Sequence, residues 1–313
     1  MRTVLRAEGL TKRFGRLVAV DGLNLEVREG EVFGFLGPNG AGKTTTLRLF
    51  CALIAPTAGT AEIAGWRLGR DDARIRASVG ILTEVPGLYE RQTADENLRF
   101  YAALYGLTRR AADAQVARFL RLMGLWELRD EPVATFSRGM KQKMAIARAA
   151  LHEPRILFLD EPTTGLDPDA AKTVRDFVLA LRAEGRTVFL CTHNLDEADR
   201  LCDRIAFFRH RVLRLDTPER LRAELYGRTT EIHILPAPLP EHLVRVTRVE
   251  GVRGVSSENG SILVASDDPL RTNPRVVRAL VEAGAEIAYV SERRIPLEEV
   301  YLRIVEPRAG GPS

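Results

Sequence analysis

The sequence predicts an α/β fold in which a mixed, largely parallel sheet carries an α-helical subdomain and precedes a small α+β domain. Three observations lead to this fold class. Residues 31–55 have the pattern of a buried strand, a glycine-rich loop and a helix in direct succession. Apolar strands alternate with helices on both sides of residues 93–150, which indicates a parallel sheet. Residues 93–150 repeat their apolar side chains at helical spacing, which predicts an all-helical insert.

The first part of the chain is expected to supply most of the sheet. Residues 4–8 and 23–27 have the composition of short strands, and residues 31–36 form an apolar run that suits a buried strand. A helix is expected over residues 45–55, because Pro56 and the glycine three residues later would end it. The remaining elements before the helical insert are expected at residues 61–63 (strand), 70–77 (helix) and 79–82 (strand).

The strands resume after the insert. Residues 155–161 are an apolar strand that ends in two carboxylates. The next helix repeats its apolar face from Val174 onward, and Gly185 is placed to end it. The elements that follow are expected at residues 187–192 (strand), 194–201 (helix), 205–208 and 212–215 (a hairpin).

The order of elements changes after a helix that begins at Pro218 and ends near residue 226. It becomes β-α-β-β-α-β with a final helix, a ferredoxin-like order. The expected bounds are residues 231–235, 241–249, 254–257, 261–265, 273–283, 286–291 and 297–305. We therefore expect a first domain over residues 1–220 with a helical subdomain at about 88–150, an accessory domain over 228–306 and a disordered tail over 307–313.

Composition narrows the class of protein. The 313 residues allow one large or two modest domains, and 45% hydrophobic residues suffice for a normal core. No apolar run approaches the ~18 residues of a membrane span, and we expect no signal peptide. The net charge of +4 is spread over interleaved acidic and basic residues, so we expect no nucleic-acid partner. The three cysteines, Cys51, Cys191 and Cys202, lie far apart and suit the core of a protein in a reducing compartment.

The glycine-rich loop fits the phosphate-binding pattern G-x-x-x-x-G-K-[ST]. Its glycines allow backbone N–H groups to surround an anion, and the following helix N-terminus adds partial positive charge. Lys43 is expected to reach the β- and γ-phosphates of a nucleotide, and Thr44 to ligate Mg²⁺. A chance match in a glycine-rich turn is the alternative, which the flanking strand and helix disfavour. The candidate binding residues are Gly37, Pro38, Asn39, Gly40, Ala41, Gly42, Lys43, Thr44 and Thr45.

Three polar residues at strand ends extend this site. Asp160 and Glu161 end an apolar strand, where one carboxylate can hold Mg²⁺ while its neighbour polarises an attacking water. We expect the two side chains to point differently, because adjacent strand residues alternate faces. His193, at the end of the next strand, could bond a γ-phosphate, although a lone histidine in this place is more often structural.

Motifs in the order of this chain resemble those of the ATP-binding cassette (ABC) ATPases. Residues 136–142 (FSRGMKQ) resemble the family's signature motif, whose common form is Leu-Ser-Gly-Gly-Gln. Residues 163–168 (TTGLDP) look like its D-loop, His193 like its switch histidine, and Phe14 like the aromatic residue that stacks on adenine. The resemblance covers residues 2–220 and is closest to ABC-2-type cassettes of drug, antibiotic or sodium efflux. It implies a P-loop NTPase core of the ABC type.

The resemblance implies a site shared by two chains that close head-to-tail over two ATP molecules. Residues 40–45 of one chain, apart from Ala41, would hold the phosphates together with Mg²⁺. Ser137 and Gly139 of the second chain would cover the γ-phosphate, and Asp167 of the D-loop would also lie at the nucleotide. ATP binding would close such a dimer and hydrolysis would open it.

The family's catalytic roles transfer to Glu161 as general base, to Asp160 as Mg²⁺ ligand, and to His193 as a contact of the γ-phosphate and the attacking water. Lys43 would join them in catalysis.

Two positions depart from the family pattern. Glu84 stands where the Q-loop glutamine is usual; its carboxylate can still reach Mg²⁺, directly or through water, but adds negative charge. Arg138 replaces the first signature glycine; we interpret it as pointing away from the phosphate, the alternative being a phosphate contact in trans.

These expectations combine into a function. The chain resembles the ATPase subunit of an exporter, working as a homodimer with a separate integral membrane permease at the cytoplasmic face of the cell membrane, as a peripheral protein. The aromatic-rich residues 89–105 lie where the family docks its permease; the alternative is that most of these side chains form helical core. The alternative is a soluble cassette that acts on nucleic acid or ribosomes, but such relatives carry two cassettes or a long coiled coil. An inactive regulatory cassette is disfavoured by the presence of Lys43, Asp160, Glu161 and His193.

Overall fold

The central sheet is built from the short apolar segments of the sequence. In the computed structural model, which describes residues 2–83, 87–293 and 295–305, six strands pair in the order β10-β9-β3-β8-β7-β6. The strands are β3 (Val32–Leu36), β6 (Val79–Leu82), β7 (Ile156–Asp160), β8 (Thr187–Thr192), β9 (Arg204–Arg209) and β10 (Arg211–Asp216). All neighbours are parallel except β9 and β10, so the prediction of a mixed, largely parallel sheet is confirmed.

A second, antiparallel sheet packs over one face of the first. Its strands pair in the order β2-β1-β4-β5. They are β1 (Thr3–Phe14), β2 (Leu17–Arg28), β4 (Ala58–Ile63) and β5 (Trp66–Arg67). Both β1 and β2 are longer than the sequence predicted, because their charged residues on the exposed face interrupt the apolar pattern.

One helix lies between the two sheets and joins their cores. Helix α1 (Lys43–Phe50) buries Leu47, Leu49 and Phe50 in a single hydrophobic cluster with residues of both sheets. The Phe50 ring lies 5.7 Å from Phe189 of β8, centroid to centroid. The helix ends five residues before the expected position, since Ala52 takes a left-handed backbone (φ 51°). Helix α2 (Asp72–Ser78) precedes β6.

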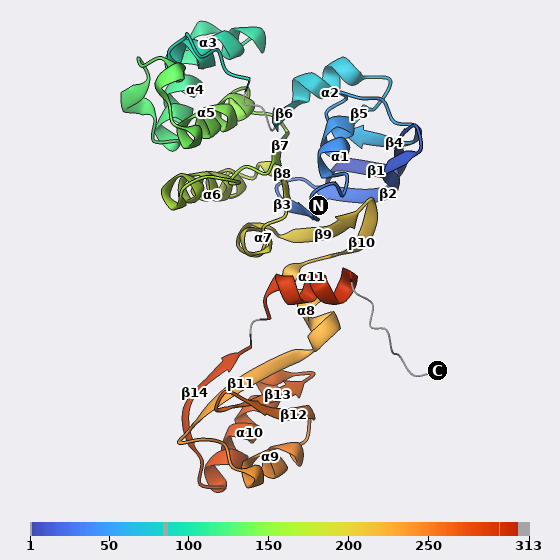
Figure 1. Ribbon diagram of the computed structural model, residues 1–313, viewed down its shortest axis with the longest axis vertical. Helices are drawn as coiled ribbons and strands as arrows, with labels where there is room; N and C mark the ends of the chain where they lie inside the picture. The colour runs from blue at the N-terminus through green and yellow to red at the C-terminus, as the bar shows by residue number, and fades with distance from the viewer. Residues whose placement is uncertain (1, 84–86, 294, 306–313) are drawn as a thin grey trace. The chain divides into compact units, whose positions relative to one another are not determined.

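The other helices of this part gather on the opposite face of the central sheet (Figure 1). They are α3 (Ala94–Leu104), α4 (Arg109–Leu122), α5 (Arg138–Ala150), α6 (Pro168–Ala183) and α7 (Leu195–Leu201). Helix α5 packs against α3, α4 and α6. Apart from two short 3₁₀ turns, the described residues from Thr93 to Ala150 contain only α-helices as regular elements, which confirms the predicted helical insert.

The chain divides into two units, Met1–Thr217 and Pro218–Ser313. The second begins with α8 (Pro218–Tyr226), which packs against α11 (Leu297–Val305). Between them, antiparallel strands pair in the order β12-β13-β11-β14. They are β11 (Arg228–Leu235), β12 (Val252–Glu258), β13 (Ser261–Ser266) and β14 (Glu286–Glu292), with helices α9 (Pro240–Thr247) and α10 (Pro269–Glu282). This β-α-β-β-α-β order and its strand pairing confirm the ferredoxin-like prediction.

The helices of the second unit give it a core of its own. Ile232 and Ile234 of β11 pack with Val246 of α9 and with Val276 and Leu280 of α10.

The tail expected to be disordered lies outside the described residues. Within the described ranges, no helix combines the length and the apolar composition that crossing a membrane requires.

Candidate active site

The phosphate loop connects β3 directly to α1. Gly42 precedes the helix with a left-handed backbone (φ 98°), and no side chain caps the first turn. A Cβ on Gly42 would lie 2.1 Å from the carbonyl oxygen of Ala19, and one on Gly37 would lie 2.1 Å from that of Phe208. Glycine is therefore required at both ends of the loop. Because the first N–H groups of a helix lack intrahelical partners, this N-terminus is suited to an anion.

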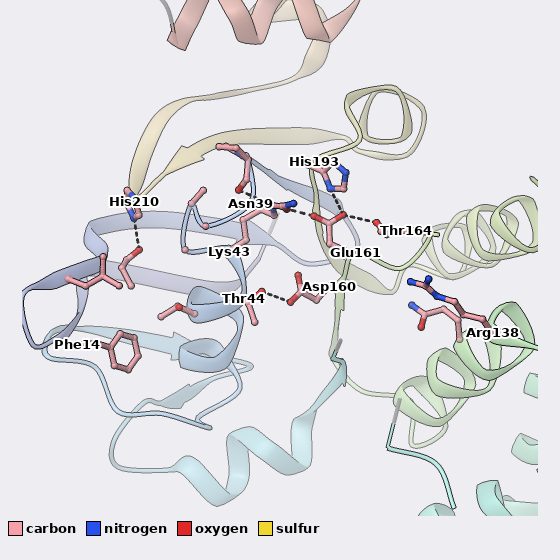
Figure 2. Close-up of a pocket in the computed structure, with 18 residues that line it drawn as sticks. Phe14, Asn39, Lys43, Thr44, Arg138, Asp160, Glu161, Thr164, His193 and His210 are labelled. Carbon is pink, nitrogen blue, oxygen red and sulfur yellow. Dashed lines mark hydrogen bonds and ion pairs between the residues drawn. The ribbon is translucent and has the colours of Figure 1, made fainter. Parts of the chain in front are cut away.

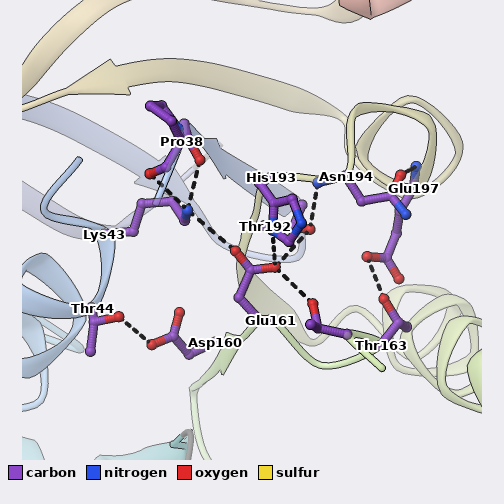
Figure 3. A network of polar contacts seen from close by, with 12 residues as sticks. Pro38, Lys43, Thr44, Asp160, Glu161, Thr163, Thr192, His193, Asn194 and Glu197 are labelled. Carbon is purple, nitrogen blue, oxygen red and sulfur yellow. Dashed lines mark hydrogen bonds and ion pairs between the residues drawn. The ribbon is translucent and has the colours of Figure 1, made fainter. Parts of the chain in front are cut away.

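Two contacts join the loop to the end of β7. The ammonium of Lys43 donates to the carbonyl oxygens of Gly37 (2.7 Å) and Pro38 (3.3 Å) and lies 3.2 Å from Oε1 of Glu161. The hydroxyl of Thr44 donates to Oδ2 of Asp160 at 2.7 Å. Figure 3 shows these as two neighbouring groups, with Lys43 at Glu161 and Thr44 at Asp160. The two adjacent carboxylates thus serve different parts of the loop.

Glu161 reaches its position through a turn of the backbone. It is the first residue beyond β7 and has φ 48°. The two carboxylates point differently, as expected, but this turn separates them and not the pleating of a strand. Oε2 of Glu161 accepts hydrogen bonds from the hydroxyls of Thr164 (3.1 Å) and Thr192 (3.3 Å) and lies 2.9 Å from Nδ1 of His193. The carboxylate is therefore held from three sides.

The charges around Glu161 decide its protonation. Burial of the carboxyl opposes ionisation, but the hydrogen bond with His193 and the positive charge of Lys43 outweigh it and lower the pKa of Glu161 below its usual 4.5. Glu161 is thus ionised at neutral pH, as a group that accepts a proton from water must be.

A cavity of about 540 Å³ lies over this network. Figure 2 shows Phe14 at one end and Arg138 at the other, with Lys43, Thr44, Glu161 and His193 between them. Phe14 is 50% exposed, so a face of its ring is accessible, and Lys12 Nζ lies 5.0 Å from the ring centre. The lining residues are Phe14, Leu17, Ala19, Pro38, Asn39, Gly40, Ala41, Gly42, Lys43, Thr44, Thr45, Arg138, Gln142, Asp160, Glu161, Thr164, His193 and His210.

The signature and D-loop residues are placed differently. Ser137, Gly139 and Asp167 are absent from the lining of this cavity. Ser137 and Asp167 instead cap α5 and α6, accepting hydrogen bonds from the backbone N–H groups of Met140 (3.2 Å) and Ala170 (2.8 Å). The structure thus does not bring these residues together with the phosphate loop of the same chain.

Of the two residues that depart from the family pattern, Arg138 and Glu84, the structure describes only the first. Arg138 lines the cavity, with its guanidinium carbon 2.8 Å from where a Cβ on Gly165 would lie. Its side chain therefore turns toward the D-loop of its own chain. Glu84 lies outside the described residues.

Sequence reasoning did not identify several residues of this site, among them Thr164, Thr192 and His210. Thr164 and Thr192 bond Glu161, and both stand beside residues that the motifs had identified. Their position next to a motif was the available signal. His210 lines the cavity from the turn between β9 and β10, where no motif pointed to it.

Comparisons with known proteins agree with this geometry. A family model described as ABC transporter matches residues 20–164. The daunorubicin resistance ATP-binding protein DrrA3 of Streptomyces coeruleorubidus is 37% identical over 303 residues, which cover 96% of this chain and 96% of that protein. The chain belongs to the ABC transporter family. It is accordingly an ATP-binding protein and an ATPase, and the resemblance inferred from the motifs is confirmed.

Other members of the ABC family extend the comparison. The bacitracin transport ATP-binding protein BcrA of Bacillus licheniformis is 42% identical over 206 residues, 66% of either chain. A solved structure described as the ATP binding subunit of an ABC transporter has a TM-score of 0.67 and 32% identity, covering 72% of this chain and 94% of that one. A dimeric post-hydrolysis state of the ATP-binding cassette MJ0796, bound to ADP and Pi, has a TM-score of 0.62 and 25% identity, covering 68% and 98%. The fold class is thereby confirmed.

Proposed function

We propose that this protein is the ATP-hydrolysing subunit of an exporter of drug-like or antibiotic molecules, acting as a homodimer with a separate membrane permease. The observation that carries the proposal is the convergence of Lys43, Glu161 and His193 on one cavity, with Thr44 and Asp160 beside them. The names of the relatives, one for daunorubicin resistance and one for bacitracin transport, support the class of substrate. They also favour a transporter over a cassette that acts on nucleic acid or ribosomes.

The phosphate loop binds the nucleotide in this proposal. The uncapped N-terminus of α1 and the Lys43 ammonium neutralise the β- and γ-phosphates, while Phe14 stacks on the base. Thr44 and Asp160 supply a hydroxyl and a carboxylate oxygen 2.7 Å apart, and such hard oxygen ligands fit Mg²⁺. When bound, Mg²⁺ would neutralise charge on the phosphates. Glu84 stays a proposed further ligand.

Glu161 acts as the general base. Its ionised carboxylate accepts a proton from the attacking water, while Thr164 and Thr192 fix its orientation. His193 is 48% exposed at its side chain, so its ring can contact both Glu161 and a γ-phosphate. Phosphoryl transfer depends mainly on positioning and charge neutralisation, which these residues provide.

A second chain completes the site. Ser137 and Gly139 begin a helix whose N-terminus can approach the γ-phosphate bound by the other copy, and Asp167 lies next to it. The dimeric state of the solved cassette MJ0796 supports this arrangement. Closing two chains over ATP and opening them after hydrolysis provides the mechanical cycle.

The permease would dock on the helical subdomain. Tyr89, Phe100 and Tyr105 are 47%, 41% and 39% exposed, and Tyr89 contacts Phe100 with ring centres 5.0 Å apart. An exposed aromatic cluster is typical of a protein interface. Docking there would hold the protein at the cytoplasmic face of the cell membrane as a peripheral subunit. Co-purification of the intact chain with an integral membrane protein tests this part of the proposal.

The exchange Glu161→Gln tests the catalytic part. It keeps the size of the side chain but removes the base, so ATP should still bind while turnover falls by at least about a hundredfold and a closed dimer accumulates. Calorimetry, phosphate release and size-exclusion chromatography measure the three quantities. Glu62→Gln, an exposed exchange on β4, is the matched control and should leave all three unchanged. Near-normal turnover of the Glu161 variant would contradict the assignment.

A further inference from the structure

His210 stands out among the residues that line the cavity. It lies between the last residue of β9, Arg209, and the first of β10, Arg211, and it has φ 59°. A side chain rarely adopts this left-handed backbone, and residues held there often serve a function. Figure 2 shows the His210 ring at the edge of the cavity, next to the phosphate loop. None of the roles assigned above involves this residue.

The backbone of His210 is fixed from two sides. Its N–H donates to the carbonyl oxygen of Ala41 in the phosphate loop at 2.9 Å, and its carbonyl accepts from the N–H of Asp21 in β2 at 2.7 Å. The turn therefore connects the phosphate loop with the strand that leads to the Phe14 end of the cavity. These two bonds hold the backbone of the turn, so the side chain of His210 starts from a defined position.

The side chain is oriented by a third bond. Nδ1 of His210 lies 3.3 Å from the carbonyl oxygen of Ala19. A carbonyl can only accept, so Nδ1 carries the proton, and Nε2 of the neutral ring is left as an acceptor. The same carbonyl of Ala19 lies where a Cβ on Gly42 would clash. The ring is thus beside the start of α1, while Leu17 and Phe14 line the cavity further along the β1–β2 hairpin.

A nucleotide with its phosphates on the start of α1 and its base at Phe14 would have its ribose between them, in the part of the cavity that Ala19 and His210 line. We propose that His210 is a ribose-binding residue, whose Nε2 accepts a hydrogen bond from a ribose hydroxyl of ATP. The inference rests on the ATP site described above. The competing explanation is that histidine occupies this turn only because it tolerates a left-handed backbone.

The exchange His210→Asn separates the two explanations. Asparagine adopts the left-handed backbone as readily as histidine, so the turn is kept, but its side chain is too short to replace Nε2. Binding of ATP and of 2′,3′-dideoxy-ATP is measured by calorimetry for the intact wild-type chain and the variant. The wild type should bind ATP about fivefold more tightly than the dideoxy nucleotide, the effect of one hydrogen bond. The variant should lose this preference, because its affinity for ATP falls while its affinity for the dideoxy nucleotide stays the same.

In the His210→Asn variant, two results would overturn the inference: an equal loss of affinity for both nucleotides, or no loss for either. His210→Gly, which has no left-handed penalty, provides the same comparison if the asparagine variant folds poorly. A wild-type chain that binds neither nucleotide would overturn the ATP site itself, and a wild type that binds both equally would overturn only the role of His210.

Discussion

Two helix N-termini in the first unit, those of α1 and α5, begin at or beside glycines but differ in how their first turn is satisfied. Helix α1 follows Gly42 and has no side-chain cap, whereas Ser137 caps α5 by accepting from the N–H of Met140. An uncapped N-terminus retains N–H groups for an anion, and a capped one has already engaged one of them. In the proposed mechanism, the α1 end can therefore bind phosphate in a single chain, while the α5 end is stable without it.

Gly42 at the start of α1 and Gly139 at the start of α5 also differ in what surrounds them. Gly42 is confined by backbone, since an added Cβ would meet the Ala19 carbonyl oxygen. Gly139 is confined by side chains, because its Cβ would lie 3.2 Å from that of Ala170 and 3.4 Å from Oδ2 of Asp167. Side chains can adjust by a few tenths of an ångström and backbone carbonyls much less. The first terminus is therefore the more rigid of the two.

Replacing Gly42 by alanine should have the largest effect. The left-handed backbone alone costs ~1–2 kcal/mol, and the clash with Ala19 displaces the loop, so ATP affinity should fall on the order of a hundredfold. Calorimetric titration with ATP measures it. Gly65→Ala is the matched control: φ is 84° and nothing lies within 4 Å, so it should lower thermal stability but not ATP affinity. Equal ATP affinities of the two variants would refute the rigidity of the first terminus.

Removal of the Ser137 cap at the N-terminus of α5 should change the ATPase rate more than the affinity for ATP. Ser137→Ala removes one hydrogen bond from the first turn of α5, which costs about 1 kcal/mol of stability, and removes the hydroxyl proposed to face the other chain's phosphate. The ATPase rate should fall about tenfold with ATP affinity of the single chain unchanged. Thr108→Ala removes the equivalent cap of α4 and should cost similar stability at a normal rate. Equal rates of the two variants would assign Ser137 a structural role only.

Arg138→Ala tests the first residue of α5. Its side chain is exposed and, among the described residues, has no ion-pair partner, so we expect a change in ATPase rate of less than about tenfold, or ~1.4 kcal/mol of barrier. Steady-state phosphate release is the measurement. A larger loss that Arg138→Lys restores would show that positive charge at this position reaches a phosphate.

The smallest expected effect concerns the thermal stability of the protein and the residue Glu197, which packs against the D-loop. Glu197 is 3% exposed and accepts a hydrogen bond from Thr163 at 2.9 Å. Burial raises the pKa of Glu197 above its usual 4.5, although the bond with Thr163 opposes this. The contribution of Glu197 to stability is therefore full below the unfolded pKa and is lost as pH rises through the folded one.

The exchange Glu197→Gln removes this titration while keeping the shape of the side chain. The variant should gain thermal stability over the wild type at pH 8, and the gain should shrink as pH falls toward 4.5. Melting temperatures of both proteins across this range measure the difference. A gain that is the same at every pH would show that the charge of Glu197 plays no part.

The parts of the site that sequence could predict are those that a local motif or the end of a strand marks. The phosphate loop was predictable because an apolar strand, three glycines and a helix follow one another within residues 31–55. The carboxylates and His193 were predictable because parallel strands end at the same edge of a sheet. The assignments of individual roles stay predictions for the experiments above.

The rest depended on contacts between distant residues or on single backbone angles. His210 contacts a residue 191 positions away, and no local pattern records such a contact. The left-handed backbone of Glu161 and Ala52 falls on residues that favour helices, so propensity pointed the other way. The lengths of β1 and β2 were underestimated because exposed charged residues alternate with the buried ones.

The ion pair between Lys43 and Glu161 has a consequence for the timing of hydrolysis. After the hydrogen bond with His193, the ammonium of Lys43 is the main cause that lowers the pKa of Glu161, and in the proposed mechanism it is also the group that receives the phosphates. When Lys43 turns to a nucleotide, the carboxylate loses that positive neighbour and gains negative charge nearby, and both changes raise its affinity for a proton. If Glu161 is the general base, as we propose, it would be a weak base in the empty protein and a stronger one once the nucleotide has bound.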